Sequence, residues 1–154
     1  MNLINYTLTL IVSFLGLILG IILAYIAKEE LKPGKKYFIL LQKVILTSIV
    51  AFLFFYWSNK NIFLFIICLF ASFILIYFFI EKIKTHHIYK VLGLIFYFSS
   101  KDIEIFKIQA FLIFLYGLPT GSLLTKVTKR NYFRVILNHT YFIIIALLSF
   151  FIEF

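Results

Sequence analysis

The stretch LTLIVSFLGLILGIILAYIA (8–27), followed at once by KEELKPGKK (28–36), decides the fold of this chain. The first segment carries no charge and has about the 20 residues that a helix needs to cross a hydrocarbon core of about 30 Å. The rest of the chain repeats this alternation, and the 154 residues are 64% hydrophobic and 14% charged, with a mean hydropathy of +1.08. Soluble domains have about 45–50% apolar and about 25% charged residues. A water-soluble fold is therefore excluded.

The apolar runs predict an all-α, polytopic membrane bundle in a single domain, 1–154, because the loops are too short to form a soluble domain. The run 85–100 has only about 12 strongly apolar residues, so its length alone leaves open a short crossing or a re-entrant segment. Pro33-Gly34 predicts a turn between the first two helices. The predicted helices are 8–27, 37–57, 61–80, 85–100, 103–124 and 135–152.

The distribution of lysine and arginine decides between five and six crossings. Cytoplasmic loops are enriched in these residues, and with six crossings the basic segments 28–36, 82–90 and 126–134 lie together on the cytoplasmic side. With five crossings, the last of these would lie opposite the first and the asymmetry would largely vanish. We therefore expect six helices in the cell membrane, with both termini outside. The net charge of +9 then orients the helices and attracts anionic lipid headgroups, and no nucleic-acid partner is expected.

Tyrosine rings prefer the membrane interface, and most tyrosines of this chain lie near the ends of the predicted helices. We interpret them as interfacial anchors. The residues are Tyr6, Tyr25, Tyr37, Tyr56, Tyr77, Tyr89, Tyr97 and Tyr132.

Small residues on the first helix predict close helix packing. Ser13, Gly16, Gly20 and Ala24 recur at helical spacing on one face, and the two glycines form a GxxxG motif, which lets another backbone approach closely. Six helices need such grooves themselves, so packing inside the bundle is favoured over a homo-oligomer. Another membrane protein remains an alternative partner.

The segment Gly117-Leu-Pro-Thr-Gly-Ser122 predicts an irregular fifth helix. Pro119 cannot donate a hydrogen bond to the carbonyl of Leu115, so the helix should kink or unwind there. Transporters use such broken helices to bind ions or substrates. In the alternative interpretation, Thr120 and Ser122 satisfy the freed backbone groups without any ligand.

Polar residues at membrane depth point to a possible site. Lys43 lies about 10 Å into the second helix and either contributes a charge to this site or extends back to the surface. Arg134 and Asn138 are four residues apart on one face of the last helix. The candidate polar pocket comprises Gln42, Lys43, Pro119, Thr120, Ser122, Arg134, Asn138 and His139.

Dividing the chain after Lys84 gives two sets of three helices, which would be related as an inverted repeat. Short matches support the division, including Gln42 with Gln109. Matches this short also arise by chance in a biased sequence, so the repeat stays open.

No catalytic signature is present. The chain has six acidic residues, one cysteine (Cys68), and neither a nucleophile elbow, a zinc-protease motif nor a P-loop. The rings of His86 and His87 point about 100° apart on a helix, so neither a metal nor a cofactor is expected. The sequence favours a non-enzymatic subunit or scaffold of a membrane complex. The alternative is a small transporter-like or lipid-binding protein with an inward-facing polar pocket around a broken fifth helix.

Two segments resemble a known group. The stretch 29–38 (EELKPGKKYF) and the stretch 114–121 (FLYGLPTG) are similar to small uncharacterised archaeal multi-pass membrane proteins. The resemblance covers two loops with their helix ends. It implies a multi-pass membrane fold and transfers no activity and no site residue.

Overall fold

The computed structural model describes residues 2–58, 61–79, 83–124 and 132–152, and every regular element in these ranges is an α-helix. The predicted all-α bundle is confirmed. Four segments are long and apolar enough to cross a membrane, namely α1, Pro33–Trp57 of α2, α5, and Val135–Ile152. The elements are α1 (Leu3–Ile26), α2 (Lys28–Trp57), α3 (Ile62–Phe79), α4 (Thr85–Ser99), α5 (Ile103–Leu124), α6 (Tyr132–His139) and α7 (Tyr141–Ile152).

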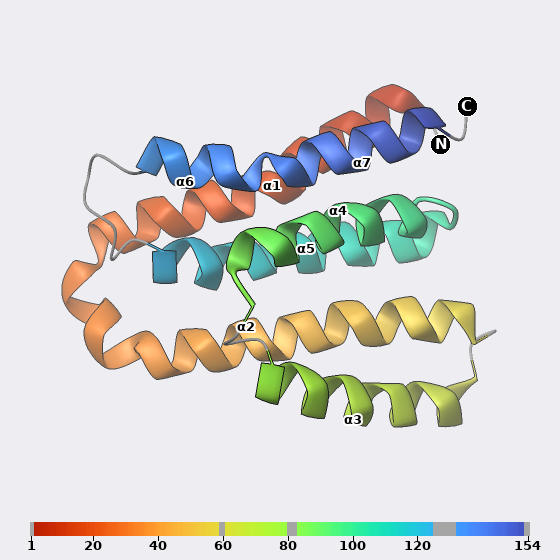
Figure 1. Ribbon diagram of the computed structural model, residues 1–154, viewed down its shortest axis with the longest axis horizontal. Helices are drawn as coiled ribbons and strands as arrows, with labels where there is room; N and C mark the ends of the chain where they lie inside the picture. Colours follow the sequence, from red (N-terminus) through yellow and green to blue (C-terminus); the bar gives the residue numbers. More distant parts are fainter. Residues whose placement is uncertain (1, 59–60, 80–82, 125–131, 153–154) are drawn as a thin grey trace.

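The helices run back and forth along the bundle, and the two ends of the chain lie at the same end of it (Figure 1). The last traverse is made by α6 and α7 together, with Thr140 between them. Here the backbone N–H of Ile144 still donates to the carbonyl of Thr140, and the Thr140 hydroxyl donates to the carbonyl of Leu137 at 2.7 Å. The predicted helix 135–152 is therefore one interrupted span.

Asparagine or aspartate side chains cap three helices at their N-termini. The Asn2 side chain accepts a hydrogen bond from the N–H of Ile4 at the start of α1. Asn61 does the same at the start of α3, and Asp102 at the start of α5. Such caps satisfy N–H groups that have no partner within the helix. They explain why α1 begins at Leu3, five residues before the predicted start.

The predicted turn at Pro33-Gly34 is wrong. Both residues lie inside α2, which begins at Lys28 directly after Ala27 and is 30 residues long. Pro33 is the sixth residue of α2, past the first turn, and a proline inside a helix commonly bends it. Figure 1 shows the first turns of α2 at an angle to the rest. The basic segment 28–36 thus extends the second helix instead of forming a loop.

The short helix α4 is largely covered by its neighbours. Its 15 residues span about 22 Å, less than a hydrocarbon core of about 30 Å. It packs against α7 and α5, and most of its residues are buried. A Cβ at Gly93 would lie 2.8 Å from the carbonyl oxygen of Phe142 on α7, so this glycine permits the close approach. Neighbouring helices therefore cover the element that is too short to span alone.

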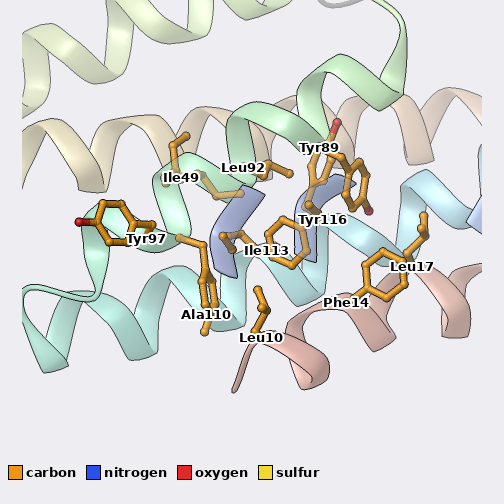
Figure 2. Close-up of a cluster of buried hydrophobic side chains, with 14 of the residues drawn as sticks. Leu10, Phe14, Leu17, Ile49, Tyr89, Leu92, Tyr97, Ala110, Ile113 and Tyr116 are labelled. Atoms are coloured by element: carbon orange, nitrogen blue, oxygen red, sulfur yellow. The ribbon is translucent and has the colours of Figure 1, made fainter. Parts of the chain in front are cut away.

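Aromatic side chains from α1, α4, α5 and α7 form the centre of the core. Tyr6 is fully buried, with ring centroids 5.2 Å from Phe96, 5.9 Å from Phe106 and 4.5 Å from Phe150. Its hydroxyl donates to the carbonyl of Ala146 at 2.9 Å. The core continues with side chains from α1, α2, α4 and α5 (Figure 2). By contrast, α3 packs mainly against α2, at the edge of the bundle (Figure 1).

The helix contacts do not follow an inverted repeat. Such a repeat would pair α1 with α4 and α2 with α5, so the extensive packing of α1 on α5 should recur between α4 and α2. Instead, α4 packs on α7 and α5, and a groove separates it from α2.

Candidate functional site

A polar seam joins α2 to α5. The side-chain amide of Gln42 donates hydrogen bonds to the Tyr116 hydroxyl at 3.1 Å and to the Thr120 hydroxyl at 3.0 Å. Further along the seam, the side-chain amide of Gln109 donates to the backbone carbonyl of Ile49 at 2.8 Å. Each helix thus contributes a glutamine that bonds to the other helix. Such bonds hold membrane helices in register.

Two further polar side chains lie beside this seam. Tyr89 of α4 is buried with its ring centroid 5.9 Å from that of Tyr116 (Figure 2). The His139 ring meets the Tyr89 ring edge to face at 4.8 Å. His139 Nδ1 lies 2.7 Å from the carbonyl of Val135, so it is the protonated ring nitrogen and Nε2 is an acceptor. Within the described residues, Nε2 has no hydrogen-bond partner, and the Tyr89 hydroxyl, which lies near the Thr120 side chain, makes no hydrogen bond of good geometry.

The candidate pocket is only partly assembled. Gln42, Thr120 and His139 belong to one buried cluster with Tyr89 and Tyr116. The other predicted members lie elsewhere or bond in another direction. The described residues of the cluster carry hydroxyl, amide and imidazole groups and no carboxylate.

Lys43 lies on another face of α2. Its ammonium group is 3.4 Å from the carbonyl oxygen of Tyr77 near the end of α3, and 4.3 Å from the centre of the Tyr77 ring. The side chain is 6% exposed, so it does not extend to the surface. The hydroxyl of Ser122 donates to the carbonyl of Gly20 on α1, and Asn138 is exposed. The side chain of Arg134 lies outside the described residues.

The predicted unwinding of the fifth helix is wrong. α5 is helical from Ile103 to Leu124, and Pro119 is buried within it. The Thr120 hydroxyl donates to the carbonyl of Tyr116, and the Ser122 hydroxyl donates to that of Leu118. α5 stays helical through Pro119, and α1 packs along it.

Glycines on both partners bring α1 and α5 into backbone contact. Ser13, Gly16, Gly20 and Ala24 are all buried, and the Ser13 hydroxyl donates to the carbonyl of Ala110 on α5 at 3.1 Å. A Cβ at Gly16 would overlap the carbonyl of Phe114, and one at Gly20 would lie 2.9 Å from that of Gly117. The close approach that the GxxxG motif predicts is thus made within the chain.

Three features of this region escaped the sequence analysis. Gly117 and Gly121 form a second GxxxG motif, which faces the first: a Cβ at Gly121 would lie 2.7 Å from the backbone nitrogen of Ile21. The spacing alone could have revealed it. Tyr89 was interpreted as an interfacial anchor and Tyr116 was not singled out, yet both are buried. Tyr6 and Tyr97 are buried too, whereas Tyr25, Tyr37 and Tyr77 are exposed.

We expect Tyr89→Phe and Tyr116→Phe to change stability in opposite directions. The first removes a buried hydroxyl that makes no hydrogen bond of good geometry with the described residues, and an unsatisfied group of this kind costs about 1–3 kcal/mol. The second loses the hydrogen bond from Gln42, and such bonds average about 0.6 kcal/mol between membrane helices. Thermal unfolding of both variants in the same detergent measures the difference. Equal losses in the two variants would contradict the bonding pattern.

Among the described residues, no three His, Cys, Asp or Glu side chains gather to hold a metal ion. Of the cluster's groups, the Tyr89 hydroxyl and His139 Nε2 are the ones left for hydrogen bonding. Comparison with known proteins adds nothing to this geometry. No family model, no curated protein and no solved structure matches the chain. The similarity to archaeal membrane proteins therefore stays a prediction.

Proposed function

We propose that this chain is a non-enzymatic subunit of a membrane complex and that α3 is the helix that contacts its partner. The observation that carries the proposal is the exposure of α3. Among its described side chains, Ser72 alone is buried, and large apolar residues face outward around most of the helix. Lipid can cover such a surface, but a bundle that leaves one helix attached mainly along α2 also offers a long apolar face to another membrane helix.

The hydrogen bonds of the polar residues also favour a structural role. A solute-handling protein needs polar side chains that face a water-accessible cavity. Here Gln42, Thr120 and Ser122 bond between helices, while Lys43 bonds to the end of α3. These residues form hydrogen bonds that hold neighbouring helices of the bundle together. The alternative, a transporter-like pocket, was based on a broken fifth helix, and α5 is continuous from Ile103 to Leu124.

The orientation that we propose has six crossings and both termini outside the cell membrane. The start of α1 and the end of α7 lie at the same end of the bundle, which is compatible with this orientation (Figure 1). The lysine-rich segment 28–36 lies at the start of α2, and Lys84 lies at the start of α4. Our proposal puts both on the cytoplasmic side, where loops are enriched in basic residues. Residues 126–131 of the third basic segment lie outside the described residues.

A photoreactive residue at position 70 tests the proposal. Phe70 on α3 is 63% exposed, and Phe111 on α5, at 60%, offers a matched control. We expect benzoylphenylalanine at position 70 to give one discrete protein adduct after illumination of native membranes. The same residue at position 111 should give only lipid adducts, because our proposal leaves that face of α5 to lipid.

Mass spectrometry of the adduct then identifies the partner, which is either another membrane protein or a second copy of the chain. Lipid adducts alone at both positions would contradict the proposal. A small solute that copurifies at one per chain and is lost from Lys43→Leu would support the transporter-like alternative instead.

A further inference from the structure

An apolar groove lies where α2, α3 and α4 meet. Its walls are Leu46 and Val50 of α2, Ile76 of α3, and a row of α4 side chains from His87 to Ile95 that includes Val91. Its exposed lining is apolar and it is partly open to the outside. The nine residues from His87 to Ile95 make it about 12 Å long.

The size of the groove suits a single hydrocarbon chain. Its volume is about 210 Å³. That exceeds the roughly 150 Å³ of an apolar cavity that binds benzene, and it is below the roughly 300 Å³ at which pockets for drug-sized ligands begin. An elongated space of this volume has room for part of one acyl chain and none for a helix, whose diameter is about 10 Å or more.

Basic side chains gather at one end of the groove. His87 lines it and is exposed, and Lys84 is exposed one turn before it. The described residues 83–90 include two lysines and two histidines and no acidic residue. Lys90 lies over the Tyr141 ring of α7 at 4.8 Å, so its charge is held on the other side of α4, and the headgroup site rests on Lys84 and His87. A negative headgroup is favoured beside such a cluster.

We propose that the groove binds one anionic phospholipid, with an acyl chain between α2, α3 and α4 and the headgroup beside Lys84 and His87. The groove opens beside Val91, which is 54% exposed on the outer surface of a bundle whose apolar faces are those that a bilayer covers. A bilayer lipid can therefore enter from the side without passing through water. The site is distinct from the polar cluster at Tyr89 and from the outward face of α3.

The proposal predicts lipid retention with a preference for charge. The purified full-length chain is delipidated, placed in mixed micelles with equal phosphatidylglycerol and phosphatidylcholine, and analysed by native mass spectrometry. We expect one phosphatidylglycerol per chain. Val91→Trp fills the groove and should abolish retention, whereas Val12→Trp should not, because Val12 is equally exposed, at 55%, on α1 away from the groove.

The double variant Lys84→Gln, His87→Gln distinguishes the contribution of the lipid headgroup to binding from that of the acyl chain. It changes only exposed side chains, and it should keep one lipid while losing about fivefold of the preference for phosphatidylglycerol. Photocrosslinking tests the unaltered protein. A phosphatidylglycerol with a diazirine in its acyl chain should crosslink to the peptides that contain Val50 and Val91.

Three outcomes would overturn the proposal: crosslinks spread over all exposed helices, retention in Val91→Trp equal to that in Val12→Trp, or displacement of the phospholipid by an equal concentration of free fatty acid. None of these results depends on whether α3 has a protein partner.

Discussion

Replacing Gly16 by alanine should push α1 away from α5 and destabilise the bundle strongly. The added Cβ would overlap the backbone carbonyl of Phe114, and backbone cannot turn aside as a side chain can. Overpacking costs about 1–3 kcal/mol, and occasionally more. We expect a loss of about 3 kcal/mol, at the upper end of that range, because any shift also strains the bond from Ser13 to Ala110 and that from Ser122 to Gly20.

Gly34 gives the matched control. A Cβ there would meet only the far end of the Phe38 side chain, at 3.3 Å, and alanine is favoured over glycine in a helix by about 1 kcal/mol. Gly34→Ala should therefore be neutral or stabilising. The two variants are compared by thermal unfolding followed by size-exclusion chromatography in the same detergent. A Gly16→Ala protein as stable as Gly34→Ala would refute the backbone contact between α1 and α5.

Replacing Tyr6 by alanine should have the second large effect. The ring is fully buried and contacts aromatic rings from three other helices, so its removal leaves a cavity where those helices meet. Large aromatic truncations in cores cost about 3–5 kcal/mol. Tyr6→Phe retains the ring and loses only the hydrogen bond to Ala146, so it should cost about 0.6 kcal/mol.

Tyr37 serves as the exposed reference, because it is 64% exposed on α2 and its truncation should change stability by no more than about 0.5 kcal/mol. Unfolding free energies from titration with a denaturing detergent rank the three variants. If Tyr6→Ala and Tyr6→Phe lose equal stability, the hydroxyl and not the aromatic packing holds α1 in the core.

The helices could be predicted from sequence because the bilayer fixes their length. The span 103–124 was predicted to the residue, and α3 and α4 to within one residue at each end. Which face of each helix is buried could not be predicted in the same way. A helix that is apolar all round, such as α3 or α7, carries no periodic signal to show its inner face.

The polar residues illustrate the same difficulty. Gln42 and Lys43 are neighbours on α2, yet one bonds to α5 and the other to α3, because two different helices pack on the two faces. The sequence placed them in one pocket since it could not tell which helices lie beside α2. Pro119 misled because the loss of one backbone donor did not unwind a helix that packs along α1.

The glycine contact between α1 and α5 also bears on how the protein is made. Ser122 and Gly20, which bond across this contact, are 102 residues apart in the chain. At synthesis rates of about 5–20 residues per second, α1 waits about 5–20 s in the membrane before α5 emerges. During that interval its glycine face is open to any other helix with a small-residue face. Nascent chains that end before α5 should therefore pair through α1, and completion of α5 should release them.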